Sequence, residues 1–157
     1  MIEIERKYLV NSSDYRSLAF SKSHIVQGFL NTHPDRVVRI RIEDDIGFLT
    51  VKGRSNTEGT SRFEWEKKIP ATEARQLLEL CEKEILEKIR YCVRMGNHII
   101  EIDEFLGTNR GLVIAEIEFE KEDDKIEVPS WVGLEVTGDI KYYNSHLSKY
   151  PYKEWKV

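Results

Sequence analysis

An alternation of apolar and polar residues with a period of two constrains the fold of this chain more than any other feature. It recurs along most of the sequence and is typical of strands with one buried and one polar face. Turn-forming segments at 44–47, 96–97 and 106–111 join neighbouring strands closely, so the sheet must be largely antiparallel. The expected strands cover residues 2–10, 37–43, 48–54, 62–69, 88–94, 98–105 and 113–120.

Helical periodicity appears in fewer segments. Residues 72–85 carry an apolar stripe with Thr72 as the expected N-cap, and residues 13–19 and 139–149 are shorter helical candidates. No linker, repeat or low-complexity tract interrupts the pattern. We therefore expect the 157 residues to form one domain, 1–157, which is long enough to bury a hydrophobic core.

The overall charge excludes some classes of protein. The net charge of −4 argues against a dedicated nucleic-acid binder, which normally has a basic surface. We expect no signal peptide and no membrane partner, because the N-terminus has no basic start before an apolar segment and no run could cross a bilayer. Cys81 and Cys92 form no C-x-x-C pair, which favours a reduced, cytoplasmic protein. The sequence does not decide whether the chain forms a homodimer.

Charged residues make up 33% of the chain and are sorted by sign along the strands. Side chains at i and i+2 share a face, and two like charges about 4 Å apart at an effective dielectric of about 20 cost roughly 4 kcal/mol. A ligand of opposite charge relieves this repulsion, whereas a solvated surface gains nothing from it. We therefore prefer a closed barrel with a charged ligand tunnel over a sheet with one wet face. The like-charged pairs are Glu3/Glu5, Arg39/Arg41, Lys52/Arg54, Glu64/Glu66, Lys88/Arg90 and Glu116/Glu118.

The two kinds of charge suit the two parts of a metal–polyphosphate complex. Carboxylates are the hard ligands that Mg²⁺ and Mn²⁺ prefer, and guanidinium and ammonium groups bind phosphate oxygens. Asp103 could add a ligand or orient a water that attacks the terminal phosphorus. The sequence has no P-loop and no zinc spacing among its histidines. The carboxylate candidates are Glu3, Glu5, Glu116 and Glu118, and the cationic candidates are Lys7, Arg39, Arg41, Lys52 and Lys88.

The first strand also carries a known signature. Its segment Glu3-Ile4-Glu5-Arg6-Lys7 resembles the E-x-E-x-K motif of the CYTH superfamily, the triphosphate tunnel metalloenzymes. Each further match is short, but together they follow the family's order along nearly the whole chain. They are residues 27–30, 38–41 (R-x-R), 50–52, 62–66 (R-x-E-aromatic-E), 88–91 (K-x-R-Y), 101–103, 116–119 (E-x-E-F) and 135–144.

The resemblance implies a mostly antiparallel α+β fold, in which a closed eight-stranded β-barrel with a charged interior forms a tunnel flanked by a few helices. It also implies that the tunnel binds a small-molecule triphosphate together with Mg²⁺ or Mn²⁺. Transferred residue by residue, the metal ligands are Glu3, Glu5, Glu116 and Glu118, and the phosphate ligands are Lys7, Arg39, Arg41, Lys52, Lys88, Arg90 and Lys141.

Within the family, this compact chain is most similar to the short bacterial inorganic triphosphatases. The resemblance therefore implies metal-dependent hydrolysis of triphosphate to diphosphate and phosphate. One position departs from the pattern, because Phe29 stands where bacterial relatives often have a Tyr that pairs with the signature lysine, here Lys7. The remaining candidates for activating water are Lys7, Glu64, Asp103, Tyr142 and Tyr143.

Several other functions fit the same residues. A thiamine or nucleoside triphosphatase, or a class IV-type adenylyl cyclase, needs an apolar or aromatic recess at the tunnel mouth, and the sequence does not reveal one. A polyphosphate-binding module without catalysis would use the same cations. A structural barrel would use its charges only for solvation.

Overall fold

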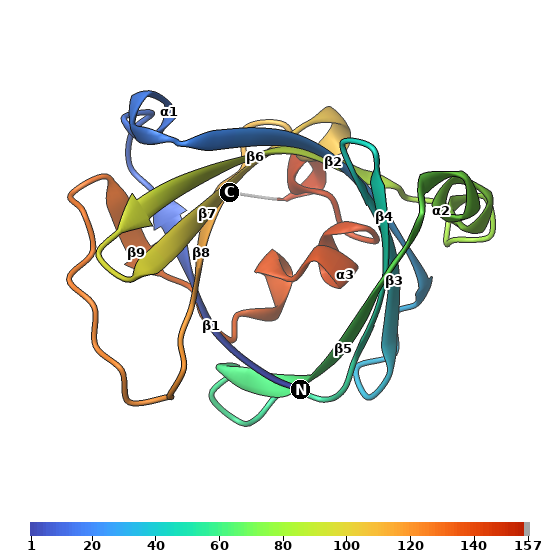
Figure 1. Cartoon of the computed structure of the whole chain (residues 1–157), viewed down its shortest axis with the longest axis horizontal. Coiled ribbons are helices and arrows are strands. Elements are labelled where there is room, and N and C mark those ends of the chain that lie inside the picture. Colours follow the sequence, from blue (N-terminus) through green and yellow to red (C-terminus); the bar gives the residue numbers. More distant parts are fainter. Residues whose placement is uncertain (156–157) are drawn as a thin grey trace.

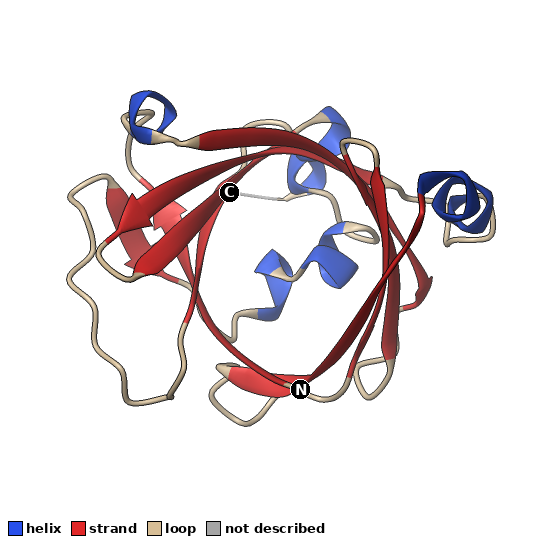
Figure 2. Ribbon diagram, viewed as in Figure 1, coloured by secondary structure: helices blue, strands red, loops and turns tan. Residues whose placement is uncertain are grey.

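The computed structural model describes residues 1–155 as nine strands with short helices between them (Figures 1 and 2). The strands are β1 (Ile2–Val10), β2 (Ser21–Asn31), β3 (Val37–Glu43), β4 (Ile46–Lys52), β5 (Ser61–Pro70), β6 (Leu86–Met95), β7 (His98–Phe105), β8 (Val113–Glu118) and β9 (Val132–Glu135). Eight of them form a closed antiparallel barrel in the order β5-β4-β3-β2-β6-β7-β8-β1, because β1 pairs back onto β5. Strand β9 pairs with β1 outside this ring. The eight-stranded barrel expected from the sequence is confirmed.

The alternation located most strands but not all. The predicted strands 2–10, 37–43 and 98–105 have the observed bounds. Strand β2 was found only in part, through its match to the family at 27–30. It escaped the alternation because residues on both of its faces are buried, including the small residue Gly28. The predicted strand 48–54 begins two residues earlier, directly after a tight turn in which Asp44 has a φ of 52°.

The helices are shorter than the sequence suggested. They are α1 (Tyr15–Leu18), α2 (Ala71–Leu78) and α3 (Asn144–Leu147), with the 3₁₀ turns η1 (Gly107–Asn109), η2 (Ile140–Tyr142) and η3 (Tyr152–Glu154). The predicted helix 72–85 was too long, because the chain turns after α2 so that the Glu82 amide donates to the Phe29 carbonyl at 2.8 Å. The N-cap is Pro70 and not Thr72. Within residues 1–155, no helix has the length and apolarity of a membrane span.

One hydrophobic core lies outside the barrel, against the outer face of β1, β6, β7 and β8. Ile100, Ile102 and Ile117 are fully buried there. Trp131 and Tyr15 cover them, and their rings lie 5.8 Å apart. This cover explains why the apolar side of each alternating strand points outward while the charged side points inward.

A second core closes one end of the barrel from within. Figure 1 shows α3 inside the ring of strands. Its Leu147 is 1% exposed and packs with Phe29, Leu86, Phe105 and Ile114, which face inward at one end of their strands. The interior therefore has an apolar part at one end, packed against the C-terminal segment, and a charged part that the sequence analysis anticipated.

Candidate active site

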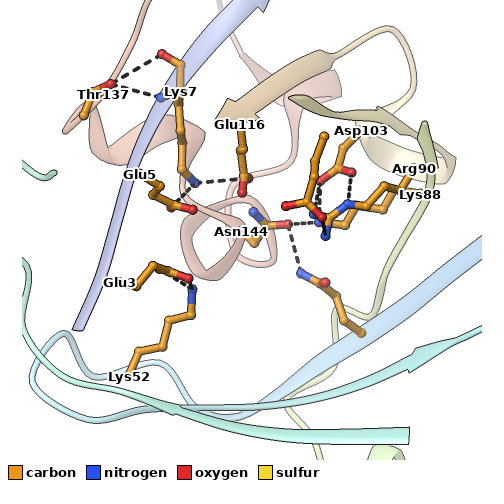
Figure 3. A network of polar contacts seen from close by, with 12 residues as sticks. Glu3, Glu5, Lys7, Lys52, Lys88, Arg90, Asp103, Glu116, Thr137 and Asn144 are labelled. Atoms are coloured by element: carbon orange, nitrogen blue, oxygen red, sulfur yellow. Dashed lines mark hydrogen bonds and ion pairs between the residues drawn. The ribbon is translucent and has the colours of Figure 1, made fainter. Parts of the chain in front are cut away.

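The barrel strands direct charged side chains into one interior space. Figure 3 shows Lys7 of β1 pointing toward Glu116 of the neighbouring β8, and Glu3 pointing toward Lys52 of β4. Glu5 and Lys7 line the central cavity together with the cations of β3, β4 and β6, and all three β1 residues line a small cavity beside it. The predicted site residues that the structure brings together are Glu3, Glu5, Lys7, Arg39, Arg41, Lys52, Glu64, Lys88, Arg90, Asp103, Glu116 and Glu118.

Asp103 on β7 anchors the cations of β6. Its carboxylate accepts hydrogen bonds from Arg90 Nε at 2.7 Å and Nη2 at 2.9 Å, and Lys88 Nζ lies 2.8 Å away. Burial disfavours the charged form of Asp103, but Arg90 and Lys88 outweigh burial and hold its pKa below the ordinary value. At Lys88 burial is the larger effect and lowers the pKa of the ammonium group to about 8.

Two amide side chains that the sequence analysis left out of the site belong to this network. Asn144 Oδ1 accepts hydrogen bonds from Lys88 Nζ at 3.0 Å and from Gln27 Nε2 at 2.9 Å. The Oε1 of Gln27 is buried and has no hydrogen-bond partner within the described part of the chain. The position of Gln27 on the strand could have suggested an inward side chain. The role of Asn144 depends on how α3 enters the barrel, which no local pattern records.

Lys7 is held between two carboxylates. Its Nζ lies 3.7 Å from Glu116 and 4.0 Å from Glu5. Against the effect of burial, these two groups hold the pKa of Lys7 above its ordinary value. Likewise against burial, Lys7 and Arg90 hold the pKa of Glu116 well below its ordinary value. Lys7 is therefore cationic at neutral pH, which suits a phosphate contact better than a general base.

Lys52 forms a second group with carboxylates of β1 and β5. Its Nζ lies 3.0 Å from Glu3 and 3.1 Å from Glu64. Burial and then the neighbouring Glu64 raise the pKa of Glu3. Arg62, which the sequence analysis did not assign to the site, extends the group, with its Nε 3.8 Å from Glu3. Its place two residues before Glu64 on β5 was the signal that could have identified it.

Arg39 and Arg41 on β3 keep part of their hydrogen-bonding capacity free. Both contact Glu66, at 3.3 and 3.5 Å respectively, and Arg39 also donates to Thr50 at 3.1 Å. Their Nε atoms are buried without a hydrogen-bond partner among residues 1–155. Burial and the like charge of Arg41 lower the pKa of Arg39 to about 10. These N–H groups are therefore suited to donate hydrogen bonds to a further anion.

Carboxylates are in excess where β1 meets β8. Glu5 lies directly opposite Glu118 in the strand register. Burial and the Glu116 charge raise the pKa of Glu5 to about 7. Burial and the charges of Glu101, Glu3 and Glu5 raise that of Glu118 to about 7. These raised pKa values show that local positive charge is too small to stabilise every carboxylate in its ionised form.

Lys141 is the predicted site residue that the structure leaves outside this cluster. It lies in η2, is exposed, and places its Nζ 5.1 Å from the ring centre of Tyr142 and 5.0 Å from that of Trp155. The ring of the neighbouring Tyr143 instead lies beside the charged cluster. Lys7 Nζ lies 5.1 Å from the centre of its ring.

Comparison with known proteins now identifies the family. A sequence profile of the CYTH domain matches residues 1–148. The chain belongs to the CYTH family. The resemblance of its first strand and of the ordered segments after it is thereby confirmed.

Similar CYTH proteins carry a common name. An "Inorganic triphosphatase" of Acetivibrio thermocellus is 48% identical over 155 residues, which cover 98% of this chain and 97% of that protein. Another, from Nitrosomonas europaea, is 35% identical over 155 residues, which cover 94% and 97% respectively. The crystal structure of the inorganic triphosphatase NE1496 has a TM-score of 0.63 at 30% identity, covering 93% of this chain and 97% of that one.

Membership of the CYTH family implies a divalent metal, and the donor set fits one. Within residues 1–155, no three carboxylate, imidazole or thiol groups already converge as metal ligands. The chemistry is nevertheless suitable, because Glu3, Glu5 and Glu118 are oxygen donors whose pKa values are raised by burial and, after it, by neighbouring carboxylates. Glu116 differs from them, because Lys7 and Arg90 already compensate its charge.

Phe29 belongs to the apolar end of the CYTH barrel. Its side chain is 3% exposed and packs in the core that α3 completes. It also lines the central cavity together with Lys7 and Tyr143. Of the two tyrosines considered from the sequence, Tyr143 faces Lys7, whereas Tyr142 is buried against Trp155 with ring centres 5.3 Å apart.

Proposed function

We propose that this protein hydrolyses inorganic triphosphate to diphosphate and orthophosphate with Mg²⁺ or Mn²⁺. The observation that carries the proposal is the convergence of buried cations from β1, β3, β4 and β6 with under-compensated carboxylates from β1 and β8 in one closed interior. A triphosphate with a divalent ion complements both sets. The two relatives named inorganic triphosphatase, which match nearly the full chain, support this choice of substrate.

The cations would hold the three phosphoryl groups. The candidates are Lys7, Arg39, Arg41, Lys52, Lys88 and Arg90. Arg39 and Arg41 are the best supported, because each has a buried Nε donor without a hydrogen-bond partner in the described residues. Leaving such a donor unpaired costs about 1–3 kcal/mol, which a phosphate oxygen would recover.

Binding would require an exchange of partners inside the barrel. The central cavity has a volume of about 40 Å³, room for only a few waters at about 10–15 Å³ each. Phosphate oxygens would therefore replace Glu116 and Glu3 as partners of Lys7 and Lys52. The released carboxylates would be free to hold the metal. The proposed metal ligands are Glu3, Glu5, Glu116 and Glu118.

When bound, the metal ion neutralises charge on the transferred phosphoryl group and on the leaving diphosphate. Lys7 adds a fixed positive charge beside it. Between the two carboxylates considered for orienting water, the contacts favour Glu64, whose one ion pair within residues 1–155 is with Lys52. Asp103 is fully buried and engaged by both Arg90 and Lys88. It would instead fix the two cations that contact the substrate.

The decisive experiment is an activity panel of substrates against metals. Inorganic triphosphate, thiamine triphosphate and ATP would each be supplied with Mg²⁺ or Mn²⁺, and orthophosphate, diphosphate and cyclic AMP would be measured. We expect inorganic triphosphate to give the highest kcat/KM. Cyclic AMP as the main product from ATP would assign a cyclase instead. Tight triphosphate binding without turnover under either metal would assign a polyphosphate-binding module.

We also place the protein in the cytoplasm, acting on a small molecule without a nucleic-acid or membrane partner. Both Cys81 and Cys92 are free thiols, as in proteins kept under reducing conditions. Cell fractionation tests the location. Light scattering coupled to size-exclusion chromatography tests the homodimer that the sequence leaves open.

A further inference from the structure

A second cavity lies at the end of the barrel where α3 enters. Its volume is about 460 Å³, far larger than that of the central cavity. It is bounded by the turn before β3, the loop between β4 and β5, and the segment from Gly138 to Lys149. Of the residues that the sequence analysis considered for the site, Tyr143 lines it.

The side chains around this cavity are basic. Arg54, Arg62, His146 and Lys149 line it, and we call this opening the basic mouth. Its described lining contains no Asp or Glu. Arg54 is paired with Asp35 beside the cavity, whereas Lys149 is exposed and has no ion-pair partner within residues 1–155. The hydroxyl groups of Ser55 and Thr57, in the loop after β4, add donors to the same space.

The basic mouth adjoins the central cavity. Arg62 and Tyr143 are among the residues that line both cavities. Another cavity, of about 830 Å³, shares no lining residue with the central one, and its charged lining is mostly acidic. It contains Glu101, Glu118 and Glu120. A polyanion is therefore favoured at the basic mouth and repelled at the other.

We propose that the basic mouth is a phosphate-binding subsite that holds a phosphoryl group beyond the three in the tunnel. Lys149 and Arg62 supply its positive charge, and the groups of the β4–β5 loop supply hydrogen bonds. The same chemistry would accept the end of a linear polyphosphate longer than triphosphate or a free orthophosphate. This proposal rests on the proposed function, because the tunnel is taken to hold a triphosphate unit.

The test compares Lys149→Glu with Lys153→Glu. Both variants change the net charge equally, and both residues are exposed near the C-terminus, but Lys153 lines neither the basic mouth nor the tunnel. Calorimetry on metal-free protein gives the Kd of tripolyphosphate and tetrapolyphosphate without turnover. In the wild type we expect tetrapolyphosphate to bind about tenfold more tightly, equivalent to about 1.4 kcal/mol. Lys149→Glu should remove this preference, and Lys153→Glu should retain it.

A second arm measures inhibition of triphosphate hydrolysis by orthophosphate. If the occupant is free orthophosphate, its inhibition constant should rise about tenfold in Lys149→Glu and stay constant in Lys153→Glu, with no chain-length preference in the wild type. Equal behaviour of the two variants in both arms would overturn the subsite. An inactive wild-type protein whose chain-length preference still depends on Lys149 would overturn the proposed hydrolysis and leave the subsite standing.

Discussion

Lys88 illustrates the balance between burial and charge inside the barrel. Its side chain is 2% exposed, and its ammonium group lies 2.8 Å from Asp103 and 3.0 Å from Asn144. These partners do not fully offset the loss of solvation, because Asp103 is shared with Arg90. Burial therefore lowers the pKa of Lys88 to about 8, close enough to neutrality to affect function.

The pH dependence of kcat/KM for triphosphate should report this group. Lys88 loses its charge as the pH rises through about 8, so kcat/KM should fall on the alkaline side, because this constant reflects ionisations of the free enzyme. Lys88→Arg keeps a positive charge and should move the alkaline fall to higher pH. An alkaline limb that is identical in wild type and Lys88→Arg would assign it to another residue.

Arg39 provides a test of substrate contact. Arg39→Ala removes a buried guanidinium with an unpaired Nε, and a charge-assisted hydrogen bond contributes about 1.5–3 kcal/mol. We therefore expect KM for triphosphate to rise roughly 10- to 100-fold. The matched control is Arg36→Ala, because Arg36 is exposed on the preceding turn. Equal KM values for the two variants would remove Arg39 from the binding site.

For single residues, the sequence predicted the strand face on which a side chain lies better than it predicted the residues that the side chain contacts. Because side chains alternate between the two faces of a strand, the sequence predicts which of them face the interior. This alternation placed Glu3, Lys7, Lys52 and Lys88 there. It could not predict that Asn144 would bridge Lys88 and Gln27, because that contact joins residues 56 and 117 positions apart in the chain. For the same reason Lys141, in an irregular segment, was predicted as a phosphate ligand although it lies outside the cluster.

Among the elements, the loop between β4 and β5 is held against the C-terminal segment by two glycines. Gly59 and Gly138 have φ values of 74° and 79°, and their backbones pass so closely that a Cβ on Gly138 would lie 2.7 Å from the carbonyl oxygen of Glu58. Only glycine fits both the conformation and the space. This crossing forms one wall of the basic mouth, because both glycines line that cavity.

Gly138→Ala should destabilise the fold more than Gly96→Ala. Gly96 has a φ of 57° but open space around its Cβ position, so alanine there costs only the backbone strain, about 1–2 kcal/mol. At Gly138 the clash with Glu58 adds about 1–3 kcal/mol. With roughly 2–4 °C of Tm per kcal/mol for a protein of this size, calorimetry should resolve the two variants. Equal Tm values would show that the loop moves to accommodate the added Cβ without further loss of stability.

Strand β2 and the end of helix α2 were predicted wrongly for the same physical reason. Strand β2 has buried residues on both faces, so its pattern lacks the polar side on which the alternation depends. The predicted helix 72–85 ends seven residues beyond the observed end of α2 at Leu78, because its apolar stripe continues into a turn that packs on β2 through Ile85, Cys81 and Gly28. Tertiary packing decided both outcomes, and local periodicity does not contain it.

In the molecule as a whole, the carboxylates of the interior fall into two classes. Against the effect of burial, hydrogen bonds and nearby cations lower the pKa values of Glu64 and Glu66, and nearby cations lower those of Asp103 and Glu116. These four groups stabilise the fold above the pKa of the unfolded chain. That contribution is lost as the pH falls into the acid range. Burial raises the pKa of Glu5 and Glu118 to about 7 from an ordinary value of 4.5, so these two groups act in the opposite direction.

The metal-free protein should therefore become less stable as the pH rises from about 5 to about 8. In this range the folded chain holds protons on Glu5 and Glu118 that the unfolded chain has already released, so the free energy of unfolding decreases with pH. A divalent ion that these carboxylates hold should oppose the decrease. At a hundredfold excess over its Kd it stabilises by about 2.7 kcal/mol, a rise in Tm of roughly 5–10 °C.

Measurements of Tm at about pH 5 and about pH 8, with and without Mg²⁺ or Mn²⁺, separate this mechanism from general ion effects. The metal should raise Tm at the higher pH and have little effect at the lower one, where protonated carboxyls bind metal poorly. Glu5→Gln should weaken both the pH dependence and the response to metal, since it removes one of the two groups with the strongly raised pKa. An equal rise in Tm at both pH values would mean that the ion binds elsewhere.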